Sequence, residues 1–264
     1  MFGWSINLFR IRGIQLAVHA SFLLLLAWYA YNGFQDNGIA GMIWNSVTLV
    51  LFFACVVLHE LGHSFTGMHY GMKIRRILLM PIGGAAQFDS ITRQPKQEIV
   101  MTLAGPAVNF VLAAILWPIV DMTHWSPDGS PASILEVGQY LLVANIVMGC
   151  FNLLPVFPMD GGRILRAILA IKLPYLRATQ VAVNIGKVLA VLAIAYCLYI
   201  GNYLTATVFT FIFIAGNAEY RMIQRQELAQ AHWEEMMRHL ARGPVAATEP
   251  PLLEPKPPQW ELGP

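Results

Sequence analysis

Three ionisable side chains lie within five residues of an otherwise apolar stretch, in the order His59-Glu60-Leu61-Gly62-His63. On a helix, positions i and i+4 share a face, so the imidazoles of His59 and His63 can reach one metal ion. Glu60 projects to another side, toward the place where a water on that metal would sit. This H-E-x-x-H spacing indicates metal-assisted hydrolysis, with Glu60 as the general base that takes a proton from the attacking water.

The apolar surroundings strengthen this interpretation. On a solvated helix, histidine and glutamate cost little free energy, so the same spacing would be weak evidence for a metal site. Inside a membrane span, an ionisable side chain costs about 2.5–3.5 kcal/mol even on a lenient insertion scale. Three such groups in one apolar helix need a compensating partner, and a bound metal ion supplies one. The sequence therefore predicts a metal site at His59 and His63.

Two histidines and a water leave one protein ligand to be found. The segment 152–162 reads Asn-Leu-Leu-Pro-Val-Phe-Pro-Met-Asp-Gly-Gly, and its prolines and glycines break an apolar helix. Because irregular backbone at membrane depth is tolerated only where it is buried in protein or lines a wet cavity, Asp160 is the best candidate for the third ligand. Cys55 lies one turn before His59 and is an alternative, although a lone buried cysteine more often fills space. The other rivals stand at helix ends, where snorkelling to water explains them: Glu98, Glu136 and Glu219.

The composition places these residues in a membrane protein. Of the 264 residues, 56% are apolar and 12% are charged, against about 45–50% and about 25% in a soluble domain. So few charges could not cover a soluble surface, which excludes an ordinary cytosolic enzyme, a disordered chain and a nucleic-acid binder. The net charge of +2 implies no polyanionic partner, and the three cysteines all lie in apolar stretches, which excludes a disulfide framework.

A bilayer core of roughly 30 Å requires about 20 mostly apolar residues per helix. Six stretches are predicted as spans: 14–33, 42–69, 98–120, 134–155, 183–200 and 203–220. All 17 lysines and arginines then fall on one side of the membrane, while the opposite loops carry none. By the positive-inside rule, the chain is a multi-pass cell membrane protein whose termini and active-site opening are cytoplasmic.

The fold class predicted from this pattern is an all-α membrane protein, with six transmembrane helices in residues 1–220. The apolar stretch 80–88 is interrupted by proline and glycine and is too short to span. We expect a re-entrant loop or small strand pair there, between the second and third helices, whose edge could hold an extended substrate by strand addition. A simple packing loop is the alternative. Residues 221–264 are predicted as a cytoplasmic tail, with a helix at 221–242 and then a disordered proline-rich segment.

Two motifs in this order, H-E-x-x-H and far downstream N-x-x-P-x-x-P-x-D-G, resemble the site-2 protease family of intramembrane zinc metalloproteases. The short chain is similar to compact members, without PDZ or CBS domains, that process sporulation or stress regulators. The resemblance extends over 14–220, and its further features are Gly83-Gly84 and Ala104-Gly105-Pro106 with Asn109.

This resemblance implies one Zn²⁺ per chain and Glu60 as the general base. The implied zinc ligands are His59, His63 and Asp160. Asn152 is implied to hold the substrate backbone or the developing oxyanion, and capping of the broken helix is an equally simple role for it. Gly83 and Gly84 are candidates for contact with the substrate.

The implied activity is that of an intramembrane zinc metalloendopeptidase. A zinc-activated water would hydrolyse a peptide bond in or near the transmembrane segment of a membrane protein, such as a transcription regulator or its membrane inhibitor. The lipid bilayer is the other expected partner, and no nucleic acid is expected.

Two alternatives belong to other functional classes. A membrane metal-ion transporter would need polar groups at several depths, whereas the candidate ligands here cluster in the predicted cytoplasmic half. A catalytically inactive membrane scaffold would not need the four motif residues, which are all intact: His59, Glu60, His63 and Asp160.

Overall fold

The computed structural model describes residues 4–81, 83–88, 92–122 and 130–241. Contacts divide the chain into two compact units, with the boundary between Tyr220 and Arg221. The site lies in the first unit. The proline-rich segment predicted after 242 falls outside the described residues.

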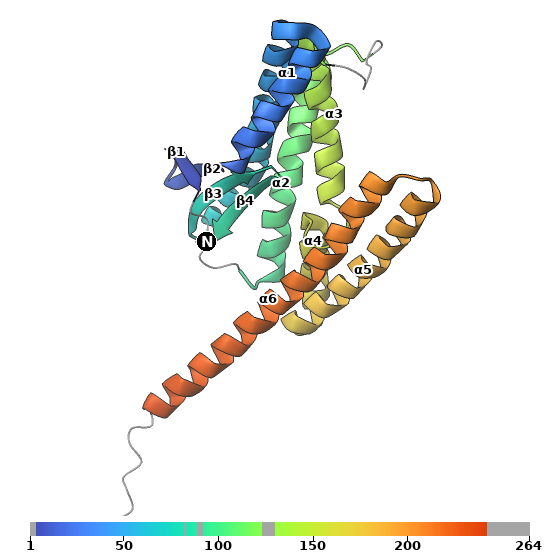
Figure 1. Cartoon of the computed structure of the whole chain (residues 1–264). Coiled ribbons are helices and arrows are strands. Elements are labelled where there is room, and N and C mark those ends of the chain that lie inside the picture. Colours follow the sequence, from blue (N-terminus) through green and yellow to red (C-terminus); the bar gives the residue numbers. More distant parts are fainter. Residues whose placement is uncertain (1–3, 82, 89–91, 123–129, 242–264) are drawn as a thin grey trace, which may run out of the picture. The chain divides into compact units, whose positions relative to one another are not determined.

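Four strands and six helices follow one another along the described chain (Figure 1). They are β1 (Ser5–Ile11), β2 (Ile14–His19), α1 (Ser21–His69), β3 (Ile74–Met80), β4 (Gly83–Phe88), α2 (Pro95–Leu116), α3 (Ile134–Asn152), α4 (Asp160–Ala170), α5 (Tyr175–Tyr199) and α6 (Tyr203–Ala241). Helices α1, α2 and α3 pack against one another, and α4 packs on both α2 and α5.

Helix α1 turns back on itself part of the way along. The backbone leaves helical geometry at Asn37 and Gly38, and Gly38 has φ 62°, which glycine adopts without a side-chain clash. Asn45 Nδ2 donates to the carbonyl oxygen of Tyr29 at 3.3 Å. These residues are 16 apart in sequence, which would place them about 24 Å apart in a straight helix. The two halves of α1 therefore lie side by side as a hairpin.

Among the described residues, four helices are long and apolar enough to cross a membrane: α1, α2, α3 and α5. The predicted limits of several spans differ from those of the observed elements. Residues 14–19 form strand β2, because a short apolar run suits a buried strand as well as a helix. Helix α3 ends at Asn152 rather than 155, ahead of Pro155. Helix α5 begins at Tyr175 rather than 183, because the helix extends beyond the apolar stretch over residues that include Arg177 and Gln180.

The chain is not all-α, because its strands form one sheet in the order β1-β2-β3-β4. The strand pair expected near 80–88 is present as β3 and β4, which pair antiparallel with Leu79 opposite Gly84. Strands β1 and β2 were not expected. Strand β2 pairs parallel to β3, with Leu16 opposite Ile77, so α1 is the crossover between two parallel strands.

The sheet packs its apolar side chains against α1. Its contribution to the shared core includes Ile14, Leu16 and Ile77, and α1 contributes Phe53 and Val56. This packing places β4, at one edge of the sheet, beside the part of α1 that carries the H-E-x-x-H motif. Helix α4, which was not expected, is short and amphipathic, and it begins at the predicted third ligand.

Candidate active site

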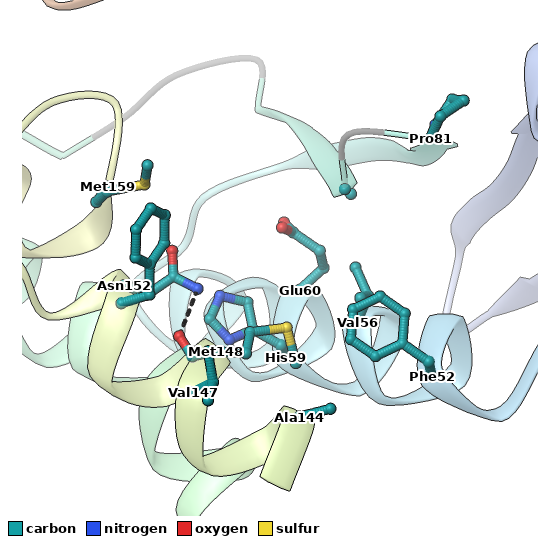
Figure 2. A pocket seen from close by; sticks show the side chains of 13 residues that line it. Phe52, Val56, His59, Glu60, Pro81, Ala144, Val147, Met148, Asn152 and Met159 are labelled. Atoms are coloured by element: carbon teal, nitrogen blue, oxygen red, sulfur yellow. Dashed lines mark hydrogen bonds between the residues drawn. The ribbon is translucent and has the colours of Figure 1, made fainter. Parts of the chain in front are cut away.

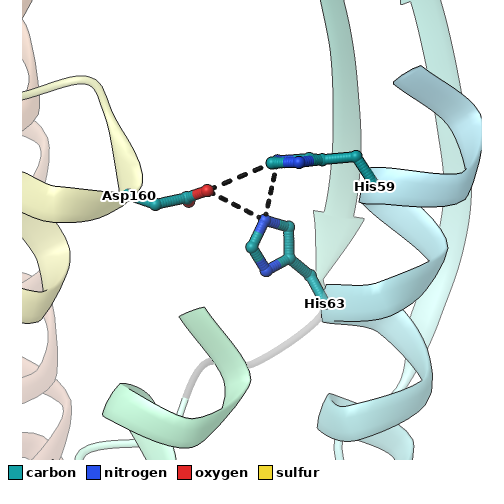
Figure 3. A group of neighbouring side chains, drawn as sticks. All are labelled: His59, His63 and Asp160. Carbon is teal, nitrogen blue, oxygen red and sulfur yellow. Dashed lines mark hydrogen bonds and ion pairs between the residues drawn. The ribbon is translucent and has the colours of Figure 1, made fainter. Parts of the chain in front are cut away.

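Two histidines of α1 and the first residue of α4 converge on one point (Figure 3). Asp160 Oδ2 lies 3.3 Å from His59 Nε2 and 3.1 Å from His63 Nε2, and the two ring nitrogens are 3.1 Å apart. All three residues are buried. The sequence separation of 97 residues between His63 and Asp160 is closed by the packing of α4 on α2.

The hydrogen bonds of His63 are compatible with a metal ion at these atoms. His63 Nδ1 lies 2.9 Å from the backbone oxygen of Met101, which can only accept, so Nδ1 carries the proton in the neutral ring. The Nε2 lone pair then faces the Asp160 carboxylate. Such an arrangement is repulsive unless a proton or a metal ion lies between the groups. Two imidazole nitrogens and a carboxylate oxygen are ligands that zinc prefers in catalytic sites.

The carboxyl group of Asp160 is held as an anion. Burial alone would raise its pKa, but protons on the facing rings of His59 and His63 outweigh burial and bring the pKa well below its usual range. A metal ion held there in place of those protons would act in the same direction. The positive charge of Arg163, on the same helix, acts in the same direction. The third ligand is therefore available as a carboxylate.

Helix α2 leaves room for the two imidazoles only because residue 105 is glycine. A Cβ atom built on Gly105 would collide with Nε2 and Cε1 of His63 and would lie 2.8 Å from His59 Nε2. On the far side of the same contact, a Cβ on Gly62 of α1 would lie 2.7 Å from the carbonyl oxygen of Ala104. Glycine at positions 62 and 105 therefore allows the backbones of α1 and α2 to pack closely beside the two imidazoles.

The position of α4 is set by its loop and by a buried ion pair. Its second and third residues, Gly161 and Gly162, lie so close to the preceding loop that a Cβ on either would meet backbone atoms. One and a half turns later, Arg166 Nε donates to Glu98 Oε1 of α2 at 3.0 Å. Arg166 is 2% exposed and Glu98 is 1% exposed. This contact ties the helix that begins at Asp160 to the helix that carries Gly105.

Glu60 and His59 line a pocket of about 410 Å³ that opens beside β4 (Figure 2). Glu60 points toward β4, and a Cβ on Gly84 would lie 2.8 Å from Glu60 Cγ. The other lining residues come mainly from α1, α3 and β4: Phe52, Val56, Pro81, Gly83, Gly84, Ala144, Val147, Met148, Phe151, Asn152 and Met159. His59, His63 and Asp160 thus meet at the metal cluster, and the other predicted site residues line this pocket: Glu60, Gly83, Gly84 and Asn152.

Asn152 lies in the pocket wall at the last position of α3. Its Nδ2 donates to the carbonyl oxygen of Met148 at 3.0 Å, one turn earlier in the same helix (Figure 2). The geometry is compatible with both roles considered for Asn152, since the residue closes the helix and also faces the pocket.

The rival ligands have other partners. Glu98 pairs with Arg166, and Glu136 accepts from the backbone of Ala132 at the start of α3. Glu219 lies 3.8 Å from Arg166 Nη1. Cys55 receives a contact of 3.4 Å from Asn145 Nδ2. In the part of the chain that the structure describes, the three-residue group able to hold a metal is made by His59, His63 and Asp160.

Two buried asparagines, Asn109 and Asn145, also take part in the site. His59 Nδ1 lies 2.5 Å from Asn109 Oδ1, and Asn109 Nδ2 donates to Asn145 Oδ1 at 2.9 Å. The available signal was an uncharged polar residue inside an apolar span, which predicts a buried hydrogen bond but does not identify its partner.

Comparison with known proteins places these motifs in one family. The family model for Peptidase family M50 matches residues 47–127 and 120–193. A zinc metalloprotease of Methanocaldococcus jannaschii is 39% identical over 221 residues, which are 84% of this chain and 62% of that relative. Stage IV sporulation protein FB of Bacillus subtilis is 25% identical over 171 residues, 63% of this chain and 56% of that protein. The chain thus spans about three fifths of the length of these relatives.

A solved structure has a similar fold. The site-2 protease from Methanocaldococcus jannaschii superposes with a TM-score of 0.60 and 39% sequence identity. The match covers 82% of this chain and 95% of the solved chain.

Proposed function

Because the chain belongs to peptidase family M50, we propose that it is a zinc-dependent endopeptidase acting inside the membrane. Its substrate would be a membrane protein, cut in or near a transmembrane segment. The observation that carries this proposal is the convergence of His59, His63 and Asp160 beside Glu60, at the wall of a pocket. The relatives named as zinc metalloproteases support the same chemistry.

In the proposed mechanism, His59, His63 and Asp160 hold one zinc ion. When bound, zinc acts as a Lewis acid that lowers the pKa of a water toward about 7 and polarises a carbonyl group. The Glu60 carboxylate takes a proton from the attacking water as the new C–O bond forms. Glu60 then gives this proton to the nitrogen of the leaving amine as the C–N bond breaks, so that one water is consumed per bond.

Asn152 would assist at the oxygen of the scissile carbonyl. An amide donor aimed at a developing oxyanion contributes about 2.7–4 kcal/mol in enzymes where it has been removed. To serve in this way, the Asn152 amide would exchange its bond to the Met148 carbonyl for one to the substrate. Its helix-closing role is the alternative, and the two roles differ in whether substitution lowers kcat or only stability.

The substrate would bind in an extended form along β4. This strand is an edge of the sheet, and its residues Gly83 and Gly84 line the pocket beside Glu60. Strand addition at such an edge supplies backbone hydrogen bonds, and these favour local unwinding of a helical substrate. Glycines at both positions let the substrate backbone come close to Glu60.

We infer six crossings of the membrane. They comprise the two halves of α1, then α2, α3 and α5, and residues 203–220 of α6. With the lysines and arginines gathered on one side, the termini and the pocket would face the cytoplasm. Residues 221–264 would form a separate cytoplasmic tail, and the substrate would be a transcription regulator or its membrane inhibitor.

A paired measurement tests the proposal. Zinc content and cleavage of a membrane-embedded substrate are compared for the purified protein and for Glu60→Gln. We expect the variant to keep its zinc and to lose cleavage, because the amide cannot accept the proton. Full activity of the variant, or no zinc in the unaltered protein, would overturn the mechanism in favour of the transporter or the scaffold.

A further inference from the structure

A continuous chain of hydrogen bonds runs from helix α3 through α2 to His59. Asn145 Nδ2 donates to the backbone oxygen of Leu141 at 2.8 Å. Asn145 Oδ1 accepts from Asn109 Nδ2 at 2.9 Å, and Asn109 Oδ1 lies 2.5 Å from His59 Nδ1. Both asparagines are 0% exposed. No charged group takes part, and every link is made in the buried interior.

The direction of donation along these hydrogen bonds is fixed at the Leu141 end. A backbone carbonyl can only accept, so Asn145 must turn its NH₂ group toward Leu141. A second hydrogen of the same NH₂ group is directed at Cys55 Sγ, at 3.4 Å. The carbonyl end of Asn145 therefore faces Asn109 and requires a donor there. Asn109 must present its NH₂ group to Asn145, which leaves its carbonyl oxygen facing His59.

From these links we propose that Asn145 and Asn109 are positioning residues that select the tautomer of His59. The Asn109 oxygen can only accept a hydrogen bond, so Nδ1 of His59 must be the donor and the neutral ring carries its hydrogen there. Nε2 is then a bare lone pair, 3.3 Å from Asp160 Oδ2 and ready for a metal. These hydrogen bonds from Leu141 through Asn145 and Asn109 to His59, here called the relay, would prepare the ligand before zinc binds. This inference rests on the zinc site proposed above.

In the neutral ring of His63, the hydrogen is likewise placed on Nδ1, but by a backbone oxygen rather than by side-chain amides. His63 Nδ1 lies 2.9 Å from the Met101 backbone oxygen, whose polarity no side-chain substitution can reverse. Only His59 depends on two amides whose ends can be exchanged by rotation. If Asn109 rotated, its NH₂ group would face Nδ1 and favour the tautomer with hydrogen on Nε2, which blocks the metal. Asn145 prevents this rotation by offering Asn109 an acceptor.

The test is the affinity of the full-length purified protein for Zn²⁺, measured by competition with a chromophoric chelator. Asn145→Leu preserves the side-chain volume but removes the acceptor that orients Asn109. Partners that orient a metal-binding histidine typically account for 10–100-fold in metal affinity, and we expect a loss in that range. Thr179→Val, which removes a buried hydroxyl bonded within α5, is the matched control and should change the affinity less than about twofold.

Making Asn145→Leu in a variant that already carries Asn109→Asp distinguishes the relay from a mere packing role of Asn145. In Asn109→Asp, the group facing His59 has an acceptor oxygen whichever way it turns, so the tautomer no longer depends on Asn145. We expect Asn145→Leu to weaken zinc binding less than about threefold in this background. An equal loss in both backgrounds, or a loss below threefold in the unaltered protein, would overturn the relay. Absence of zinc binding in the unaltered protein would instead overturn the proposed function.

A spectroscopic measurement needs no substitution at either asparagine. In the zinc-free full-length protein, nitrogen NMR of labelled imidazoles distinguishes the two neutral tautomers. The His59 signals are identified by their loss in His59→Gln. Hydrogen on Nδ1 in the neutral ring supports the relay, and hydrogen on Nε2 would refute it even if Asn145→Leu failed to fold.

Discussion

Replacing Gly105 with alanine should destroy the metal site while leaving the rest of the fold in place. The added Cβ would lie 2.8 Å from His59 Nε2 and closer still to His63, whereas ordinary contact begins at 3.4 Å. The rings must therefore move by at least about 0.6 Å, which exceeds the tolerance of about 0.2 Å for metal-ligand distances. Neither ring can simply retreat, because Asn109 and the Met101 backbone hold their other nitrogens.

Helix α2 cannot absorb the strain by moving away either. Helix α3 packs against it, and Glu98 ties it to α4 through Arg166. Overpacking of this kind costs about 1–3 kcal/mol, and displacement of the imidazoles is the available relief. We therefore expect a loss of zinc affinity of about 100-fold or more, beyond the 10–100-fold typical of altered ligand support.

Chelator competition measures the zinc affinity of Gly105→Ala, and thermal unfolding measures its stability. Gly216→Ala is the matched control, because a Cβ there meets its nearest neighbour at an ordinary 3.8 Å. If Gly105→Ala bound zinc and cleaved substrate as well as the unaltered protein, the close approach of α2 to the two rings would be refuted as a determinant of the site.

Three further predictions address the neighbouring parts of the site. Gly84→Ala should lower kcat/KM at least tenfold while zinc is retained, because the new Cβ would lie 2.8 Å from Glu60 Cγ; unchanged cleavage would contradict the packing of β4 on Glu60. Arg166→Leu should destabilise the protein by about 3–5 kcal/mol, because it leaves the Glu98 carboxylate buried without its partner. Adding Glu98→Leu should recover part of that loss in thermal unfolding, and no recovery would count against the ion pair. Asp160→Asn should reduce bound zinc below one ion per chain by metal analysis, whereas full zinc occupancy would exclude Asp160 as a ligand.

Local patterns in the sequence were sufficient to predict those site residues that lie close together within one helix or beside one helix break. The spacing of His59 and His63 predicted a shared helical face, and the structure places both rings on one face of α1. The prolines before α4 and the two glycines in its first turn marked a break in an apolar helix and pointed to Asp160. The apolar stretches identified a membrane protein. A short, mostly apolar run does not distinguish a strand from a helix, however, so β2 was predicted as helix.

Only the tertiary structure decided which distant residues meet. The pairing of β2 with β3 joins strands on either side of the 49-residue helix α1, and no local signal records that register. The same is true of Asn109 and Asn145, which are polar residues in apolar spans until packing brings them to His59. Gly105 is one of 21 glycines in the sequence, and its necessity follows only from the two rings packed against it. Sequence specifies local geometry because neighbouring residues share a backbone, whereas contacts across 36 or 50 residues exist only once the helices have packed.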